Sequence, residues 1–191
     1  FKSVIRSEEA RPLVNEFLHY LTSIQMEKLE HATFMGGEIP KNHIEEKGKI
    51  SDVLIKVENS KIILLLEMNQ YETKEIFEKN TSYAYAINTI QNKKKEKRIQ
   101  TILINFDAFN PFETKKPVLC FKMRDEDGHV ETERHLSYHL LLENSKENTY
   151  NIAKEILEFM DFFKRYESIQ ELKMKYEGKE GFKGMVKKVE D

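Results

Sequence analysis

The sequence contains little cysteine, glycine or proline and no long hydrophobic run, and each shortage excludes a class of protein. The single cysteine, Cys120, excludes an intrachain disulfide framework and every zinc motif built on several cysteines. Seven glycines and four prolines in 191 residues exclude collagen-like and low-complexity chains. The longest aliphatic run, 62–66, is far shorter than the roughly 20 apolar residues that cross a bilayer, and no signal peptide opens the sequence. We therefore expect a folded cytoplasmic protein with no membrane partner.

The charge balance and the missing motifs narrow the function further. Lysine plus arginine (31) nearly cancels aspartate plus glutamate (33), so the molecule as a whole is not a polycation that would coat nucleic acid. Any contact with nucleic acid must come from a local basic face. The sequence has no P-loop, no GxGxxG and no GxSxG motif, which argues against a nucleotide cofactor and against serine-hydrolase chemistry.

Hydrophobic periodicity predicts helices around one sheet. Helical spacing indicates a helix over 8–24 and another over 73–91, and strand-like runs at 53–57 and 62–66 indicate a hairpin. Between the first helix and the hairpin we expect a short element at 32–35 and a loop over 36–49. After the second helix we expect strands at 99–106 and 118–123 and one or two more within 129–142. The chain should then form helices from 149 and over 169–176, followed by a weakly ordered tail that contains glycine and lysine. The order predicts a mixed α/β (α+β) fold in which helices flank one mixed sheet.

The register of the hairpin brings two acidic residues together. If the loop is the favoured two-residue type with Asn59 and Ser60 at its tip, Asp52 lies directly opposite Glu67, with Cβ atoms about 4.5 to 5.5 Å apart. Like charges in that arrangement destabilise a sheet unless something neutralises them, and a hard divalent cation with oxygen ligands does so. Asn69 points to the same face. The alternative is that a three-residue loop shifts the register and both carboxylates lie in solvent, but Glu67 directly follows a run that is typical of a buried strand.

These residues also resemble a known family. Ile50-Ser51-Asp52-Val53-Leu54-Ile55, a short turn and Ile62-Ile63-Leu64-Leu65-Leu66-Glu67-Met68-Asn69 look like the D…(E)xK half of the PD-(D/E)XK nuclease superfamily. More narrowly, they resemble the recombination-promoting nuclease (Rpn) or PD-(D/E)XK transposase family. Phe1-Lys2 with the helix at 13–21, Asn80-Thr81-Ser82-Tyr83 and the strand at 99–106 are similar to further parts of that family, and the looser similarity extends through the C-terminal helices.

The resemblance implies a restriction-endonuclease-like core over 1–147, with 148–191 as a C-terminal helical extension and tail of the same domain. It implies a Mg²⁺- or Mn²⁺-dependent DNA endonuclease in which Asp52, Glu67 and a backbone carbonyl near Met68 hold the metal. It also implies a further acidic residue just upstream of Phe1. The family's lysine, often replaced by glutamine, is Asn69 here, and an amide cannot act as a base or carry charge. Asn69 is therefore expected to orient water or phosphate while the metal activates the water.

Other residues are weaker candidates. Glu16 is in the position of an accessory acid on the first long helix, although a charged residue on a solvent-facing helix surface is more common. Asn80 and Tyr83 are accessory candidates from the resemblance, and Tyr83 equally fits a core aromatic. His135 and His139 share a strand face but have no third ligand in the sequence pattern, which argues against zinc.

Lysines supply the candidate DNA contacts. Lys49, Lys56 and Lys74 flank the hairpin and the helix that follows, where they would meet phosphates, although surface lysines need no such explanation. The basic run 93–98 fits either backbone contact or a solvated helix end.

Two functions therefore remain open. The first is an active metal-dependent DNA endonuclease, possible also as a homo-oligomer. The second is a catalytically degraded relative of the nuclease fold that serves as a DNA-binding or oligomerising, regulatory module. The acidic pair Asp52 and Glu67 favours the first function, and Asn69 favours the second.

Overall fold

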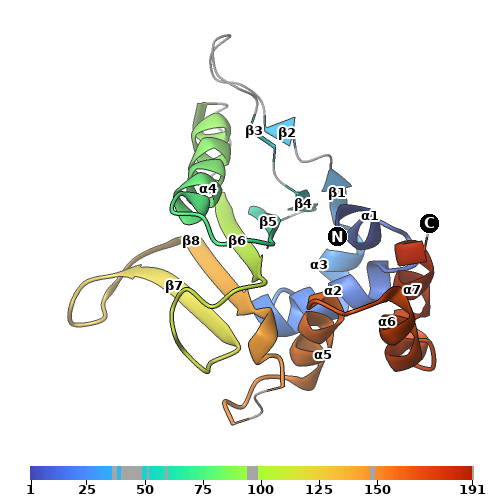
Figure 1. The fold of residues 1–191 in the computed structure, drawn as a ribbon. Coiled ribbons are helices and arrows are strands. Elements are labelled where there is room, and N and C mark those ends of the chain that lie inside the picture. Colours follow the sequence, from blue (N-terminus) through green and yellow to red (C-terminus); the bar gives the residue numbers. More distant parts are fainter. Residues whose placement is uncertain are drawn as a thin grey trace.

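A mixed sheet forms the centre of the protein (Figure 1). The structure is a computed structural model, and it describes residues 1–35, 38–39, 49–50, 52–58, 60–93, 99–146 and 149–190. Within these residues the main sheet has six strands in the order β1-β4-β5-β6-β8-β7. Their bounds are β1 Thr33–Met35, β4 Val53–Val57, β5 Ile62–Asn69, β6 Gln100–Asp107, β8 Val130–Leu141 and β7 Val118–Arg124. A separate pair joins β2 Glu38–Ile39 and β3 Lys49–Ile50.

The three central strands are parallel to one another. β6 pairs in parallel with both β5 and β8, whereas β1, β4 and β7 join the sheet in antiparallel pairs. The carboxyl ends of β5, β6 and β8 therefore meet at one edge, where side chains from strands far apart in the sequence become neighbours.

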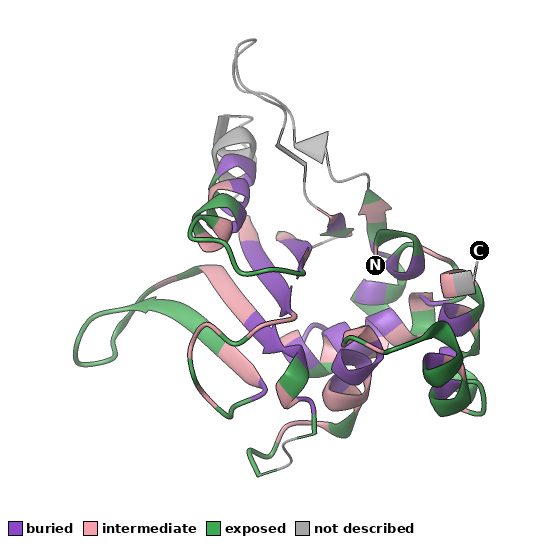
Figure 2. Cartoon of the chain, in the orientation of Figure 1, coloured by how far each residue is buried: buried purple, intermediate pink, exposed green. Residues whose placement is uncertain are grey.

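Helices cover both faces of the sheet, as the patterning predicted. On one face lie α1 Lys2–Ile5, α2 Arg11–Thr22, α3 Met26–Glu30, α5 Lys154–Phe163, α6 Ile169–Tyr176 and α7 Lys183–Glu190, with the short 3₁₀ helices η1 Leu142–Asn144 and η2 Glu180–Phe182. On the other face lies α4 Ile76–Lys93, which packs on a smaller apolar cluster. Figure 2 shows the buried residues concentrated in the sheet and on the helix surfaces that meet it.

Alternation along each strand decides which side chains meet which helices. In β5, Leu64 and Leu66 join the large core beneath α2 and α5, whereas Ile63 and Leu65 face α4. Continuing the alternation puts Glu67 and Asn69 on the α4 side. The polar end of β5 therefore lies under α4 and not in the main core.

The hairpin register is the one expected from a two-residue loop. Val53 pairs with Leu66, Leu54 with Leu65 and Lys56 with Ile63. A shift by one residue would have turned the apolar residues of one strand to the wrong face. The Asn59 part of the loop lies outside the described residues.

Two expectations differ from the structure. The first long helix begins at Arg11 rather than at residue 8, because Ser7, Glu8 and Glu9 form the turn before it, and the short helix α1 precedes that turn. The segment expected to be a weakly ordered tail instead forms η2 and α7. Its apolar residues Phe182, Met185 and Val186 follow helical spacing and are buried in the main core, which holds this segment against the domain despite its charged neighbours.

Gly184 shows how closely α7 packs on the beginning of the chain. A Cβ atom at this position would come within 2.5 Å of the Glu9 Cβ atom. Glycine is therefore required for the observed packing of α7 on the turn before α2. Figure 1 shows α1 and α7 on the same side of the molecule, and the two helices pack on each other.

None of the helices in the described part of the chain is both long enough and apolar enough to cross a membrane.

Candidate active site

Asp52 and Glu67 are joined by hydrogen bonds where the β4–β5 ladder ends. The backbone N–H of Asp52 donates to Glu67 Oε1 at 3.2 Å, and the backbone N–H of Met68 donates to Asp52 Oδ2 at 2.8 Å. Each carboxylate thus accepts a backbone N–H from the opposite strand. These bonds hold the two acidic side chains close together just past the last paired residues, Val53 and Leu66.

Burial makes this pair a site that attracts cations. Glu67 is only 3% exposed, while the Asp52 side chain is 24% exposed and so can be reached from solvent. An ammonium group already lies at the open side of the pair, because Lys2 Nζ is 3.1 Å from Asp52 Oδ1. A buried carboxylate is costly without a compensating charge or hydrogen bond, so a cation is favoured beside these oxygens.

A layer of polar side chains continues from this pair under α4. The sheet register aligns Glu67 with Asn105 and Asn105 with His139, and in the next row it aligns Asn69 with Asp107. Asn80 reaches the same layer from α4. One hydrogen-bonded network joins Asn69, Asn80, Asn105, Asp107 and His139, and each of them is at most 6% exposed.

Asp107 determines the orientation of the amides in this network. Asn69 Nδ2 donates to Asp107 Oδ1 at 2.6 Å, which leaves Asn69 Oδ1 to accept from Asn80 Nδ2 at 3.0 Å. Asn80 Nδ2 also donates to Asn105 Oδ1 at 2.9 Å. A carboxylate accepts hydrogen bonds, so the Asn69 group that faces Asp107 is assigned as the NH₂ group. The Asn69 oxygen then faces Asn80, which assigns the NH₂ group of Asn80 in the same way. Both ends of the Asn69 side chain are thus engaged inside the protein.

His139 forms the far end of the network. Its Nδ1 lies 2.8 Å from Asp107 Oδ2, so the hydrogen-bonded tautomer carries a proton on Nδ1. The rings of Phe77, Phe112 and Phe121 surround the imidazole at centroid distances of 4.9 to 5.3 Å. This aromatic enclosure separates the Asp107–His139 pair from water and strengthens the interaction within the pair.

The donor set suits a hard divalent cation. Asp52 and Glu67 offer carboxylate oxygens, and Mg²⁺ is commonly held by one or two carboxylates while it keeps several waters. In the part of the chain that the structure describes, no group of three or more histidine, cysteine, aspartate and glutamate side chains is arranged to hold a metal ion. A site that encloses the cation entirely in protein ligands is therefore not built by these residues, whereas a two-carboxylate site open to substrate is compatible with them.

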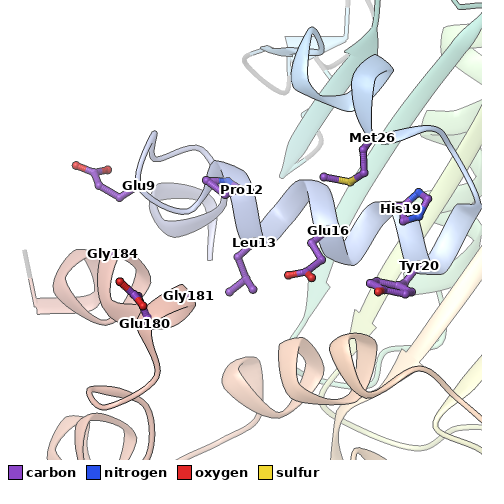
Figure 3. A pocket seen from close by; sticks show the side chains of 10 residues that line it. All are labelled: Glu9, Pro12, Leu13, Glu16, His19, Tyr20, Met26, Glu180, Gly181 and Gly184. Atoms are coloured by element: carbon purple, nitrogen blue, oxygen red, sulfur yellow. The ribbon is translucent and has the colours of Figure 1, made fainter.

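The structure does not bring every candidate residue to this pair. Glu16 lies on α2 and lines a different pocket of about 540 Å³, formed mainly by α2, with Glu9, Met26, η2 and Gly184 of α7 completing it (Figure 3). Neither Asp52 nor Glu67 lines that pocket. Tyr83 is 9% exposed and packs in the apolar cluster beneath α4, with the Lys79 ammonium 5.5 Å from its ring centroid.

Two of the candidate DNA-binding lysines, Lys56 and Lys74, have side chains that the structure describes. Lys56 is exposed on β4, and Lys74 is exposed in the turn between β5 and α4. Lys49 begins β3, and its side chain lies outside the described residues, as do residues 94–98 of the basic run.

His135 lies on β8, and its ring packs with that of Tyr85 at a centroid distance of 4.9 Å. Burial and the neighbouring Arg134 lower the pKa of His135.

Several residues of the site were not predicted as site residues. The segment with Lys2 and the strand that contains Asn105 entered only through the family resemblance, and Asp107 follows that strand where a turn is expected. The apolar-to-polar change at Asn105, after the buried residues 101–104, is the one hint that alternation alone could have supplied. Their proximity to Asn69 depends on the strand order.

Comparison with known proteins identifies the family of this protein. A search of curated proteins gave no match. Residues 1–190 match the family model described as PD-(D/E)XK nuclease family transposase. Since the match spans nearly the whole chain and includes the Asp52–Glu67 hairpin, this protein belongs to the PD-(D/E)XK nuclease family transposases.

Proposed function

We propose that the protein is a metal-dependent DNA endonuclease, and the observation that carries the proposal is the hydrogen-bonded Asp52–Glu67 pair. The pair combines a buried carboxylate with a partly exposed one at the end of the hairpin. Membership in a nuclease family indicates phosphodiester hydrolysis as the reaction class. We propose Mg²⁺ or Mn²⁺ as the cofactor, held by Asp52, Glu67 and a backbone carbonyl at Met68.

The protein residues would divide the work as follows. Asp52 and Glu67 hold the cation, which when bound lowers the pKa of a coordinated water and stabilises charge on the phosphate. In hydrolysis the water oxygen bonds to phosphorus, one ester P–O bond breaks, and the departing oxygen takes a proton. Asn69 acts from the buried network, where Asp107 and Asn80 hold it, and it keeps the end of β5 and the polar surroundings of Glu67 in place.

Most of the other candidate residues have supporting roles in this proposal. Asn80 holds the Asn69 amide, and Tyr83 fixes α4 above the polar layer through its apolar packing. Lys49, Lys56 and Lys74 would contact DNA phosphates beside the hairpin without reading sequence. Glu16, expected as an accessory acid, has no role in this proposal because it lines a separate pocket.

A non-catalytic DNA-binding or oligomerising module is the second candidate. Asn69 favours it, because this residue is neutral where the superfamily carries a lysine, and its amide is engaged within the protein. Such a protein would keep Asp52 and Glu67 without cutting DNA.

Cleavage of supercoiled plasmid tests the proposal directly. We expect nicking with Mg²⁺ or Mn²⁺ and none with Ca²⁺ or a chelator, and Glu67→Ala should abolish it. The assay uses the full-length protein. If the protein binds Mn²⁺ through Asp52 and Glu67 yet leaves supercoiled, linear and single-stranded DNA and RNA intact, the nuclease proposal is wrong and the non-catalytic module replaces it.

A further inference from the structure

The candidate site lacks a positive charge at the position where the motif would supply one. Asn69 is neutral, and its Nδ2 and Oδ1 are bonded to Asp107 and Asn80. Turning this amide toward a phosphate would break hydrogen bonds that are almost completely buried, each of which is costly to leave unmade. A positively charged side chain that assists the metal in phosphodiester cleavage would therefore have to come from another residue.

Lys2 is located where such a cation is needed. Its Nζ atom is 3.1 Å from Asp52 Oδ1, and its side chain is 49% exposed. It therefore contacts one of the two carboxylates while remaining open to a ligand that approaches from solvent.

The helix that carries Lys2 is fixed to the core. Val4 and Ile5 of α1 are at most 3% exposed. The ring of Phe1 packs 5.0 Å from the ring of Phe106 and 5.0 Å from that of Phe163, measured between centroids. Because Phe106 belongs to β6, the base of the Lys2 side chain is held in place relative to the central sheet. The backbone at Lys2 is thus fixed beside Asp52 before any ligand binds, so the ammonium can reach a ligand at this site by movement of the side chain alone.

We propose that Lys2 is a catalytic residue that supplies the positive charge missing at Asn69. This inference rests on the proposed nuclease function. Without divalent metal, the Lys2 ammonium neutralises Asp52. When Asp52 is engaged with the cation, the flexible Lys2 side chain is released to contact a non-bridging oxygen of the bound phosphate. The same residue therefore competes with metal for Asp52 and assists hydrolysis once metal is bound.

A purely structural ion pair makes a different prediction. A partly exposed pair of this kind contributes little to stability, and its loss would leave cleavage at saturating metal unchanged. In our proposal, removal of the Lys2 ammonium has opposite effects on two measured quantities. The affinity for metal should rise, and the rate of cleavage should fall. No simple loss of structure produces that combination.

The experiment compares the wild type with Lys2→Met, Lys2→Arg and the control Lys28→Met, which removes an exposed lysine on α3. Calorimetric titration with Mn²⁺ should show binding to K2M that is tighter than wild type by up to about fivefold, as expected from the loss of one partly exposed competing charge. At saturating Mn²⁺, K2M should nick supercoiled plasmid about a hundredfold more slowly, a loss typical of removing one stabilising group from a transition state. K2R should recover about tenfold or more of that loss because it restores the charge, and K28M should behave as wild type in both assays.

The outcomes separate this inference from the function on which it rests. A wild-type protein that cleaves DNA and a K2M variant that cleaves equally fast at saturating Mn²⁺ would overturn the role of Lys2 alone. Weaker Mn²⁺ binding by K2M would overturn the competition with metal. A wild-type protein that cleaves no nucleic acid would overturn the proposed function, and the catalytic role of Lys2 with it.

Discussion

The backbone N–H of Asp52 donates to the Glu67 carboxylate, while the Asp52 carboxylate accepts from the backbone N–H that follows Glu67. This reciprocal arrangement offsets the repulsion between the two carboxylates. Two carboxylates across a strand pair repel each other, but here each one also receives a hydrogen bond from the strand of the other. The folded protein therefore holds the pair together without a cation, and the metal site that we propose would not have to be assembled by the metal.

Replacing either carboxylate by its amide should weaken metal binding without disturbing the fold. Glu67→Gln keeps an oxygen that can accept from the Asp52 N–H but removes the charge, so Mn²⁺ affinity should fall by at least about tenfold and plasmid nicking should be lost. Calorimetric titration and the nicking assay measure these effects, with the exposed Glu143→Gln as the matched control. Unchanged Mn²⁺ affinity in E67Q would show that Glu67 is not a ligand.

Substitutions of Asn69 should separate positioning from charge. Asn69→Ala removes an amide that cannot take a proton, so we expect a slower cleavage rate rather than its loss. Asn69→Lys should preserve or raise the rate if the site has the expected geometry, because an ammonium that reached the phosphate would add a preorganised positive charge. Single-turnover rates at saturating Mn²⁺ provide the measurement. An N69A protein with no detectable cleavage, although it folds and binds Mn²⁺, would contradict the positioning role.

The buried polar network should make a large contribution to stability. Asp107→Ala would leave both the His139 Nδ1 proton and an Asn69 N–H without their carboxylate acceptor, and we expect the free energy of unfolding to fall by about 2 to 4 kcal/mol. Urea unfolding monitored by circular dichroism gives this value. Asp127→Ala, in an exposed turn, should change it by no more than about 0.5 kcal/mol. A similarly small change in D107A would mean that the network is stabilised in some other way.

The C-terminal helices should make folding sensitive to acid through Asp161. Burial alone would raise the Asp161 pKa, but the hydrogen bonds from Lys175, Tyr176 and Lys164 outweigh it and hold the pKa below its ordinary value of 3.8. A carboxylate with a lowered pKa in the folded state stabilises the protein fully above about pH 4, and this contribution is lost as the pH falls further. Unfolding free energies between pH 7 and pH 2 should therefore drop less steeply in Asp161→Asn than in wild type. Parallel pH profiles would rule out this contribution.

Much of the fold followed from local patterns in the sequence. The strands of the hairpin are bounded by turn residues and carry β-branched side chains, so both their extent and their register could be predicted, and the structure has the expected pairs. Helices α2 and α4 could be predicted from the helical spacing of their apolar residues. The final segment was misjudged, because glycine and lysine content was given more weight than the helical spacing of Phe182, Met185 and Val186.

Only part of the candidate site could be predicted from local sequence patterns. Asp52 and Glu67 are joined by a short loop, so register alone brings them together. Asn69, Asp107 and His139 meet because β8 pairs with β6 and leaves β7 at the edge, a choice of strand order that no local pattern encodes. Lys2 reaches Asp52 only through the packing of α1 on the core, which depends on contacts made along the entire domain.

The close approach of Gly184 to Glu9 makes the site depend on a segment that never touches it. Helix α7 packs on α1, and the turn between α1 and α2 lies against Gly184 with no room for a side chain. A methyl group at residue 184 would displace that turn, and the displacement would be transmitted through α1 to the ammonium of Lys2. Packing of the last helix therefore links the C-terminal segment to the helix that carries Lys2.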